Sequence, residues 1–255
     1  MFEASATAVI AWSLAALVVA GLVIVAARRR SRAAGGGGAG SVAGVEPASR
    51  LLLVVVAAAA AVFAATGALV AAHRTQAWDV SVLRLAARHQ QSGAVDVATA
   101  VTTLGALPVV LALLAAALLV LLFRRKRRQA AFVLAAALLA MACGGLGKVA
   151  FDRPHPKVFS SGHDWSFLTG SGSAWAFPSG HTTAISGLAA TLVVVLWPTR
   201  WRYPALALAV LVCAGVGITR VYLGAHFPTD VIAGWALALA AVGAVRLAFG
   251  DPAGA

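Results

Sequence analysis

Long apolar runs dominate this chain and restrict what it can fold into. Of its 255 residues, 61% are hydrophobic, and the mean hydropathy is +0.91. Several runs exceed the roughly 20 residues needed to cross a bilayer, and a segment in lipid must satisfy its own backbone hydrogen bonds, which favours helices. The pattern excludes a soluble domain and predicts an all-α polytopic membrane protein. Seven spans are expected, at about Ala6–Ala27, Leu51–Ala72, Val97–Phe123, Ala130–Gly147, Thr182–Trp197, Tyr203–Val221 and Val231–Phe249.

Basic residues cluster where the apolar runs stop. The chain has 20 Lys and Arg against 8 Asp and Glu, a net charge of +12. At the ends of membrane helices such residues mark the cytoplasmic side, so no nucleic-acid partner is expected. Their alternation predicts an N-terminus outside the cytoplasm and a C-terminus inside, and the Ala-, Val- and Arg-rich composition fits a bacterial inner membrane. The basic groups follow the first, third and fifth spans and lie near the end of the seventh, at Arg28–Arg30 with Arg32, Arg124–Arg128, Arg200 with Arg202, and Arg246.

The chain divides into three expected parts. Residues 1–32 form an N-terminal membrane helix with its basic flank, and residues 33–49 form a flexible Gly/Ala-rich linker. Residues 50–250 form the main membrane domain. Within it, mixed apolar and charged residues from Trp78 to Gln91 predict a short amphipathic helix on the outer surface. No feature of the sequence predicts an oligomeric state.

Three short polar clusters interrupt the apolar chain and are its main indication of function. They span Lys148–Pro156, Pro178–His181 and Arg220–Asp230, each at the end of an apolar run. The alternation of spans places all three on the outer face. Charged side chains near a bilayer are costly and are normally kept there for a task. Cations, two histidines and a carboxylate indicate an anion site that suits phosphate chemistry.

The third cluster contains a histidine and a carboxylate four residues apart. His226 and Asp230 lie where the last span begins. If a helix begins near Pro228, the carboxylate can reach back to the imidazole. A carboxylate on one ring nitrogen fixes the tautomer and leaves the other nitrogen as a nucleophile. We therefore expect His226 to attack phosphorus directly, with Asp230 orienting it.

The second cluster predicts an anion cradle with a proton donor. His181 follows Ser179 and Gly180 at the beginning of the fifth span. Backbone N–H groups at a helix N-terminus, a serine hydroxyl and the close approach that glycine allows can together bind an anion. His181 is then placed to protonate a leaving oxygen. Three cations can supply positive charge to the phosphoryl group, namely Lys148, Arg153 and Arg220.

A zinc site is the alternative use of these histidines. His155, His163, His181 and His226 are predicted to share one face of the membrane. The neighbouring Lys and Arg side chains would repel a divalent cation. The site is therefore expected to work without a metal ion or another cofactor.

The three clusters together resemble the signatures of the type 2 phosphatidic acid phosphatase (PAP2) family, which read Lys-x6-Arg-Pro, Pro-Ser-Gly-His and Ser-Arg-x5-His-x3-Asp. The second signature is matched in full by Pro178–His181. The third is matched by Arg220, His226 and Asp230, with Thr219 in place of serine. Taken together, these two matches make the resemblance highly specific.

The resemblance covers about Leu51–Phe249 and implies a six-helix membrane core, to which the first helix is an addition. It implies that His226 forms a phosphohistidine, that Asp230 orients it and that His181 protonates the leaving group. The Lys, Arg, Ser and Gly positions of the signatures would bind phosphate oxygens, with no metal needed.

The first signature departs from the family pattern. After Lys148 and six further residues the chain has His155-Pro156 where the family has Arg-Pro, and Arg153-Pro154 lies two places earlier. Either Arg153 binds the phosphate, or His155 fills that place with a weaker, pH-dependent charge. We expect Arg153 to bind phosphate with help from His155.

These features predict an integral membrane lipid phosphatase that removes the terminal phosphate of a lipid phosphate or pyrophosphate at the outer leaflet. Candidate substrates are undecaprenyl pyrophosphate, phosphatidylglycerol phosphate, diacylglycerol pyrophosphate and phosphatidic acid. Two alternatives use the same residues. A phosphotransferase would pass the phosphoryl group or the headgroup to another alcohol, and a transporter or flippase would bind the lipid phosphate without cleaving it.

Overall fold

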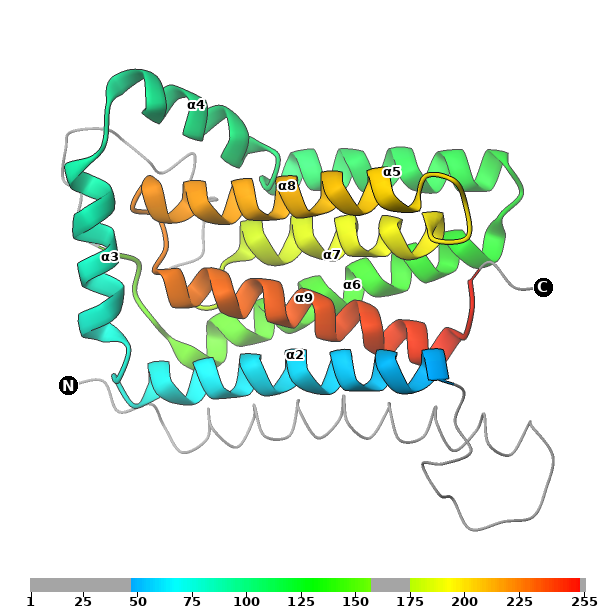
Figure 1. Ribbon diagram of the computed structural model, residues 1–255, viewed down its shortest axis with the longest axis horizontal. Coiled ribbons are helices and arrows are strands. Elements are labelled where there is room, and N and C mark those ends of the chain that lie inside the picture. Colours follow the sequence, from blue (N-terminus) through cyan, green and yellow to red (C-terminus); the bar gives the residue numbers. More distant parts are fainter. Residues whose placement is uncertain (1–46, 157–174, 253–255) are drawn as a thin grey trace, which may run out of the picture.

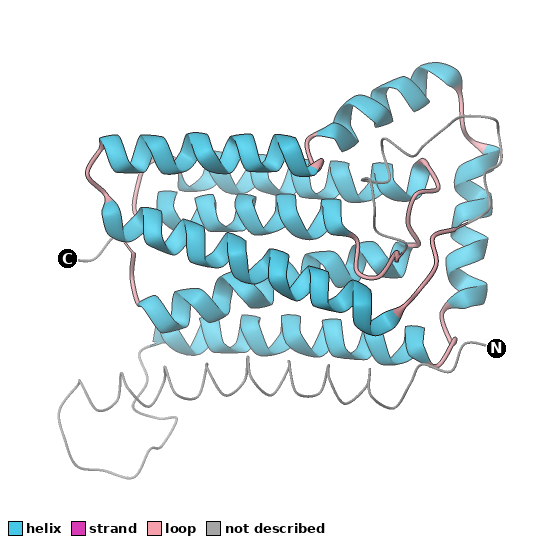
Figure 2. Cartoon of the chain, turned by 180° about the vertical axis from the view of Figure 1, so that it is seen from behind, coloured by secondary structure: helices cyan, strands magenta, loops and turns pink. Residues whose placement is uncertain are grey.

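The computed structural model describes residues 47–156 and 175–252. In these two stretches the secondary structure is helical, without strands, and one isolated bridge pairs Pro154 with Trp175. The predicted all-α class is confirmed (Figure 2). The first predicted span lies outside the described residues, as does nearly all of the linker. The helices are α2 (Pro47–Ala71), α3 (Gln76–Arg88), α4 (Ser92–Thr103), α5 (Leu107–Phe123), α6 (Arg127–Phe151), α7 (Gly180–Leu196), α8 (Arg202–Tyr222) and α9 (Pro228–Phe249).

Helices α2, α5, α6, α7, α8 and α9 run side by side and form the body of a bundle (Figure 1). Helix α9 is its centre, because it packs against α2, α6, α7 and α8 and most of its side chains are buried. The predicted amphipathic segment forms α3, which crosses one end of the bundle (Figure 1). Helix α4 then leads back towards the bundle and packs against α8.

Four helices are long and apolar enough to cross a membrane, namely α2, α6, α8 and α9. Helices α4 and α5 together could form a fifth span, which is bent by 44°. Helix α7 is apolar but has only 17 residues. Many large apolar side chains on the outside of the bundle are exposed, as expected for surfaces that contact lipid. The protein is an integral membrane protein.

The bend between α4 and α5 differs from the single run expected over Val97–Phe123. Pro108 occupies the first turn of α5, where it removes an amide donor and its ring would clash with the carbonyl group four residues earlier. At Gly105, an added Cβ atom would lie 3.0 Å from Cβ and 3.2 Å from the carbonyl oxygen of His181. The break therefore lets the backbone pass close to His181.

The two ends of the bundle differ in character. The basic α5–α6 and α7–α8 connections and the end of α9 lie at one end, with Arg124–Arg128, Arg200 and Arg246 (Figure 1). The opposite end carries α3, the end of α6 and the α8–α9 connection; we call it the polar end. All three polar clusters reach this end, as far as the structure describes them. The separation agrees with the sequence pattern, and the direction of the bundle in the membrane remains a prediction.

Candidate active site

The α8–α9 connection places His226 close to Arg220. Helix α8 is followed by Gly224 at φ 67°, the left-handed conformation that glycine adopts readily at a helix end. The Gly224 N–H donates to the carbonyl oxygen of Val221 at 2.9 Å. The N–H groups of Ala225 and His226 both donate to the carbonyl oxygen of Arg220, at 2.9 and 3.2 Å. These bonds fold the chain back, so that His226 lies beside the last turn of α8.

The beginning of α9 joins the carboxylate to the imidazole. Helix α9 begins at Pro228, as the sequence predicts. Oδ2 of Asp230 lies 3.3 Å from Nδ1 of His226 and accepts the Phe227 N–H at 2.9 Å. Because an ionised carboxylate can only accept, Nδ1 of His226 carries the hydrogen and Nε2 keeps its lone pair. Both side chains are buried.

The surroundings of His226 favour its neutral form. Burial lowers the pKa of His226 well below its ordinary value of 6.5, and the positive charge of Arg220 lowers it further. His155, Lys148 and His181 act on the pKa of His226 in the same direction. Residues from all three polar clusters therefore lie near enough to influence one imidazole. A neutral imidazole surrounded by cationic groups is the form that can attack an electrophilic phosphorus atom.

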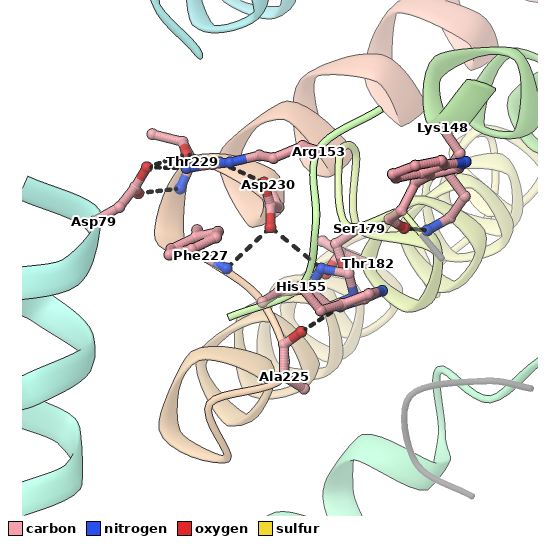
Figure 3. A network of polar contacts seen from close by, with 12 residues as sticks. Asp79, Lys148, Arg153, His155, Ser179, Thr182, Ala225, Phe227, Thr229 and Asp230 are labelled. Carbon is pink, nitrogen blue, oxygen red and sulfur yellow. Dashed lines mark hydrogen bonds and ion pairs between the residues drawn. The ribbon is translucent and has the colours of Figure 1, made fainter. Parts of the chain in front are cut away.

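His155 lies next to His226. The two ring centroids are 4.8 Å apart, with an interplanar angle of 59°. Nδ1 of His155 lies 2.8 Å from the carbonyl oxygen of Ala225 (Figure 3). Since a carbonyl oxygen can only accept, Nδ1 of His155 carries a hydrogen. The residue that departs from the family's first signature therefore lies directly beside the candidate nucleophile.

The beginning of α7 is tied to α9 by backbone bonds. The Ser179 N–H donates to the carbonyl oxygen of Asp230 at 3.0 Å, and the carbonyl oxygen of Ser179 accepts the Oγ1 hydroxyl of Thr183 at 2.9 Å. At Gly234 on α9, an added Cβ atom would lie 3.1 Å from this same Ser179 oxygen. The Pro-Ser-Gly-His turn and the helix that carries Asp230 are thus in close contact.

Lys148 and His181 both lie close to this turn. Nζ of Lys148 donates to the carbonyl oxygen of Trp175 at 2.6 Å. Its Cε lies 3.4 Å from the position that a Cβ atom would take at Gly180, so the absence of a side chain there leaves room for the lysine. His181 is buried in the first turn of α7, next to Gly105.

Arg220 is completely buried in the last turn of α8. Its Nη1 lies 3.5 Å from the hydroxyl oxygen of Thr102 on α4, at the long limit of a hydrogen bond. Helix α4 therefore also contributes to the polar end. Sequence reasoning did not identify Thr102, because it lies within an apolar run and matches none of the signatures.

The guanidinium group of Arg153 contacts two carboxylates, a hydroxyl and an aromatic ring. Its Nη1 donates to Oδ1 of Asp230 at 2.6 Å and to the hydroxyl of Thr229 at 2.8 Å. Its Nη2 donates to Oδ2 of Asp79 at 2.7 Å (Figure 3). The guanidinium carbon lies 4.0 Å from the centroid of the Phe227 ring. These contacts differ from the expected contact of Arg153 with phosphate.

Asp79 and Thr229 are two residues of this network that sequence reasoning missed. Asp79 is fully buried, although it lies on the amphipathic helix α3. One available signal was the scarcity of acidic residues: the chain has 8 against 20 basic residues, so an aspartate at the polar end is a candidate counter-ion. For Thr229, its place between His226 and Asp230 was the only signal.

The arrangement of donors bears on the zinc alternative. Within residues 47–156 and 175–252, no group of three or more His, Cys, Asp or Glu side chains is placed to hold a metal ion. His163, one of the four histidines considered, lies outside the described residues.

The fold and the polar end define a membrane protein built on a PAP2-type helical bundle. A solved structure, the transmembrane PAP2-type phosphatidylglycerolphosphate phosphatase from Bacillus subtilis, matches with a TM-score of 0.67 at 24% identity, over 75% of this chain and 94% of that one. This likeness shows the fold. Residues 129–251 match the PAP2 superfamily.

Two curated relatives match over shorter segments. The lipid A 1-phosphatase of Rhizobium etli is 38% identical over 92 residues, which are 35% of this chain and 37% of that protein. The undecaprenyl-diphosphatase of Sulfolobus acidocaldarius is 40% identical over 63 residues, 25% of this chain and 28% of that protein. The chain thus spans 28% to 37% of the length of these two relatives.

Proposed function

We propose that the protein hydrolyses the terminal phosphate of a lipid phosphate or pyrophosphate through a phosphohistidine on His226. The main support for this proposal is that the imidazole of His226 is neutral and held in one tautomer. Nδ1 of His226 is held by Asp230, and the pKa of His226 is lowered well below 6.5, first by burial and then by Arg220. Its other nitrogen, Nε2, is therefore a lone-pair donor at neutral pH, in a site that attracts phosphate.

The reaction takes place in two steps. In the first, Nε2 of His226 forms a bond to phosphorus, and the bond from phosphorus to the lipid oxygen or bridging phosphate oxygen breaks. His181 gives its proton to that leaving oxygen. In the second step, water attacks the phosphohistidine, its proton passes to His181, and inorganic phosphate leaves with His226 restored. Asp230 stabilises the positive imidazole that forms during attack.

The phosphate oxygens require a set of donors. We assign this role to Lys148, Arg220 and the Ser179-Gly180 turn at the N-terminus of α7, because the charges of the two cations act on His226 and the turn contacts α9. We add His155, whose ring lies beside that of His226. Arg153, which the sequence suggested as a phosphate ligand, is instead assigned to hold Asp230.

The substrate is a lipid because the site lies at the end of a membrane bundle. We propose that the polar end faces the outer leaflet of a bacterial inner membrane, since the basic connections lie at the opposite end. Residues 50–250 would form the catalytic domain, with residues 1–32 as an added membrane helix and 33–49 as a linker. Relatives named lipid A 1-phosphatase and undecaprenyl-diphosphatase support a lipid phosphate or pyrophosphate as the substrate class.

The test uses the full-length protein in detergent micelles, assayed with and without chelator. The substrates are undecaprenyl pyrophosphate, phosphatidylglycerol phosphate, diacylglycerol pyrophosphate, phosphatidic acid and a lipid A 1-phosphate. We expect phosphate release from at least one of them. His226→Ala should abolish release and also the ³²P-labelled phosphohistidine, which is stable in base and labile in acid.

Three results would contradict the proposal. Phosphate release by His226→Ala at the wild-type rate would exclude His226 as the nucleophile. Transfer of the phosphoryl group to an added alcohol, without release of phosphate, would identify a phosphotransferase. Binding and movement of lipid phosphate across a vesicle membrane by both wild type and variant, without cleavage, would identify a transporter or flippase.

A further inference from the structure

A buried ion network joins the surface helix α3 to the first turn of α9 (Figure 3). Asp79 on α3 accepts from Nη2 of Arg153 at 2.7 Å and from the Thr229 hydroxyl at 2.7 Å through Oδ2. Its Oδ1 accepts the backbone N–H of Thr229 at 3.1 Å. Asp79 and Asp230 are fully buried, and Arg153 is 8% exposed. Two carboxylates from distant segments thus hold one guanidinium between them.

In this network, the two carboxylate oxygens of Asp230 have different partners. Oδ1 accepts from Arg153 at 2.6 Å, and Oδ2 is left for His226 and for the Phe227 N–H. A carboxylate held by both oxygens cannot rotate about its terminal torsion, so the position of Oδ2 is determined by the arginine on the opposite side. The direction of the imidazole therefore depends on where Arg153 lies.

Asp79 in turn determines where Arg153 lies. A buried arginine needs partners for its charge, and breaking such a pair leaves an uncompensated charge that is strongly unfavourable. Lys148 and Arg220 act on the same His226, so the surroundings of Arg153 are already positive. If Asp79 is replaced by a neutral residue, Arg153 keeps only its ion pair with Asp230, of the two ion pairs that it forms among the described residues. Asp79 also accepts an otherwise unpaired N–H in the first turn of α9, the turn that carries Asp230.

We propose that Asp79 is a positioning residue for the His226–Asp230 pair, acting through Arg153 and Thr229, and that helix α3 is therefore part of the catalytic apparatus. This inference rests on the proposed phosphatase function. Asp79 does not touch the phosphate in this scheme. It keeps Arg153 on Asp230 and away from the substrate, so its loss should slow the chemical step and leave substrate binding nearly unchanged.

The experiment compares Asp79→Asn and Thr229→Val with Asp96→Asn in the full-length protein. Asp96 is an exposed aspartate on α4, so its replacement makes the same charge change without touching the network. The measurements are kcat, KM and the rate of phosphohistidine formation by rapid quench, on whichever lipid phosphate the wild type cleaves. For both network variants we expect kcat and the phosphorylation rate to fall by about 10- to 100-fold, the scale of a small misplacement of a reacting group. KM should change by less than about threefold, and Asp96→Asn should behave as wild type.

A double variant tests whether the network acts as a unit. If Asp79 works through Arg153, Asp79→Asn combined with Arg153→Gln should lower kcat no further than Arg153→Gln alone. If the double variant instead shows the product of the two single effects on kcat, the inference is overturned. Asp79→Glu keeps the charge and should recover part of the rate that Asp79→Asn loses.

Other outcomes separate this inference from the proposed function. An inactive wild type refutes the function itself. An active wild type with an unchanged phosphorylation rate in Asp79→Asn refutes only the inference, and so does a rise in KM at constant kcat, which would make the network part of phosphate binding. Thermal unfolding in detergent shows whether each variant folds. If Asp79→Asn does not fold, Thr229→Val, which keeps both carboxylates, decides the matter by the same criteria.

Discussion

Replacement of Asp230 by Asn is the most informative perturbation of this site, because the change is nearly isosteric. Three donors converge on the carboxylate: Arg153 on Oδ1 at 2.6 Å, and the Phe227 N–H at 2.9 Å with Nδ1 of His226 at 3.3 Å on Oδ2. An asparagine has one acceptor oxygen and one NH2 group, which can only donate. Whichever way the amide turns, its NH2 group faces a donor.

The two orientations of the amide have different consequences. If the NH2 group faces Arg153, the arginine loses its bond to the residue at position 230 and the charge of the pair is gone. If it faces His226, the imidazole can satisfy it only by accepting at Nδ1, which moves the hydrogen to Nε2 and removes the nucleophilic lone pair. A wrong tautomer of this kind lowers kcat by about 10⁴ in a serine protease triad.

We therefore expect Asp230→Asn to lower kcat by about 10³- to 10⁴-fold, which corresponds to about 4 to 5.5 kcal/mol of transition-state stabilisation. The assay is phosphate release in micelles, with trapping of the phosphohistidine. Asp251→Asn is the matched control, since Asp251 is 61% exposed and lies 3.4 Å from Arg246 at the other end of the bundle. A rate within tenfold of wild type for Asp230→Asn would refute the orienting role.

Three further predictions concern the same site. The pKa of His226 lies well below 6.5, and attack needs the neutral imidazole, which exists above that pKa. The acid limb of the pH profile of kcat/KM should therefore lie below pH 6.5, and an acid limb above pH 6.5 would contradict attack by His226. Gly105→Ala should lower both stability, by about 1–3 kcal/mol in thermal unfolding, and kcat, because its Cβ would press on Val216 and on Cβ and the carbonyl oxygen of His181. Gly93→Ala on α4, where a Cβ meets nothing within 4 Å, should lower neither. His155→Ala should raise KM more than it lowers kcat in steady-state assays, and an unchanged KM would remove it from phosphate binding.

The features of the polar end that agree with the sequence depend on short separations along the chain. The contact between His226 and Asp230 follows from a spacing of four residues once Pro228 begins a helix, because one helical turn brings such residues together. The gathering of the polar clusters at one end follows from the alternation of apolar runs. The bend at Gly105 and Pro108 was missed because the length and the predominantly apolar composition of the surrounding run indicated one helix.

The contacts of Arg153 could not be predicted from its neighbours in the sequence. Its spacing from Lys148 suggested a phosphate ligand, whereas its contacts are with Asp79 and Asp230, which lie 74 and 77 positions away. Asp79 is 150 positions from Thr229, with which it shares two hydrogen bonds. The local sequence of neither segment predicts these contacts.

The sequence by itself determined the class of the protein, its expected membrane helices and the chemical types that meet at one end, since each depends on hydrophobicity and helical periodicity. Only the tertiary structure decided which charges pair with which. That choice depends on how α9 packs against α3 and α6. The partners of a buried charge are determined by three-dimensional distance and by the need to compensate every charge removed from water.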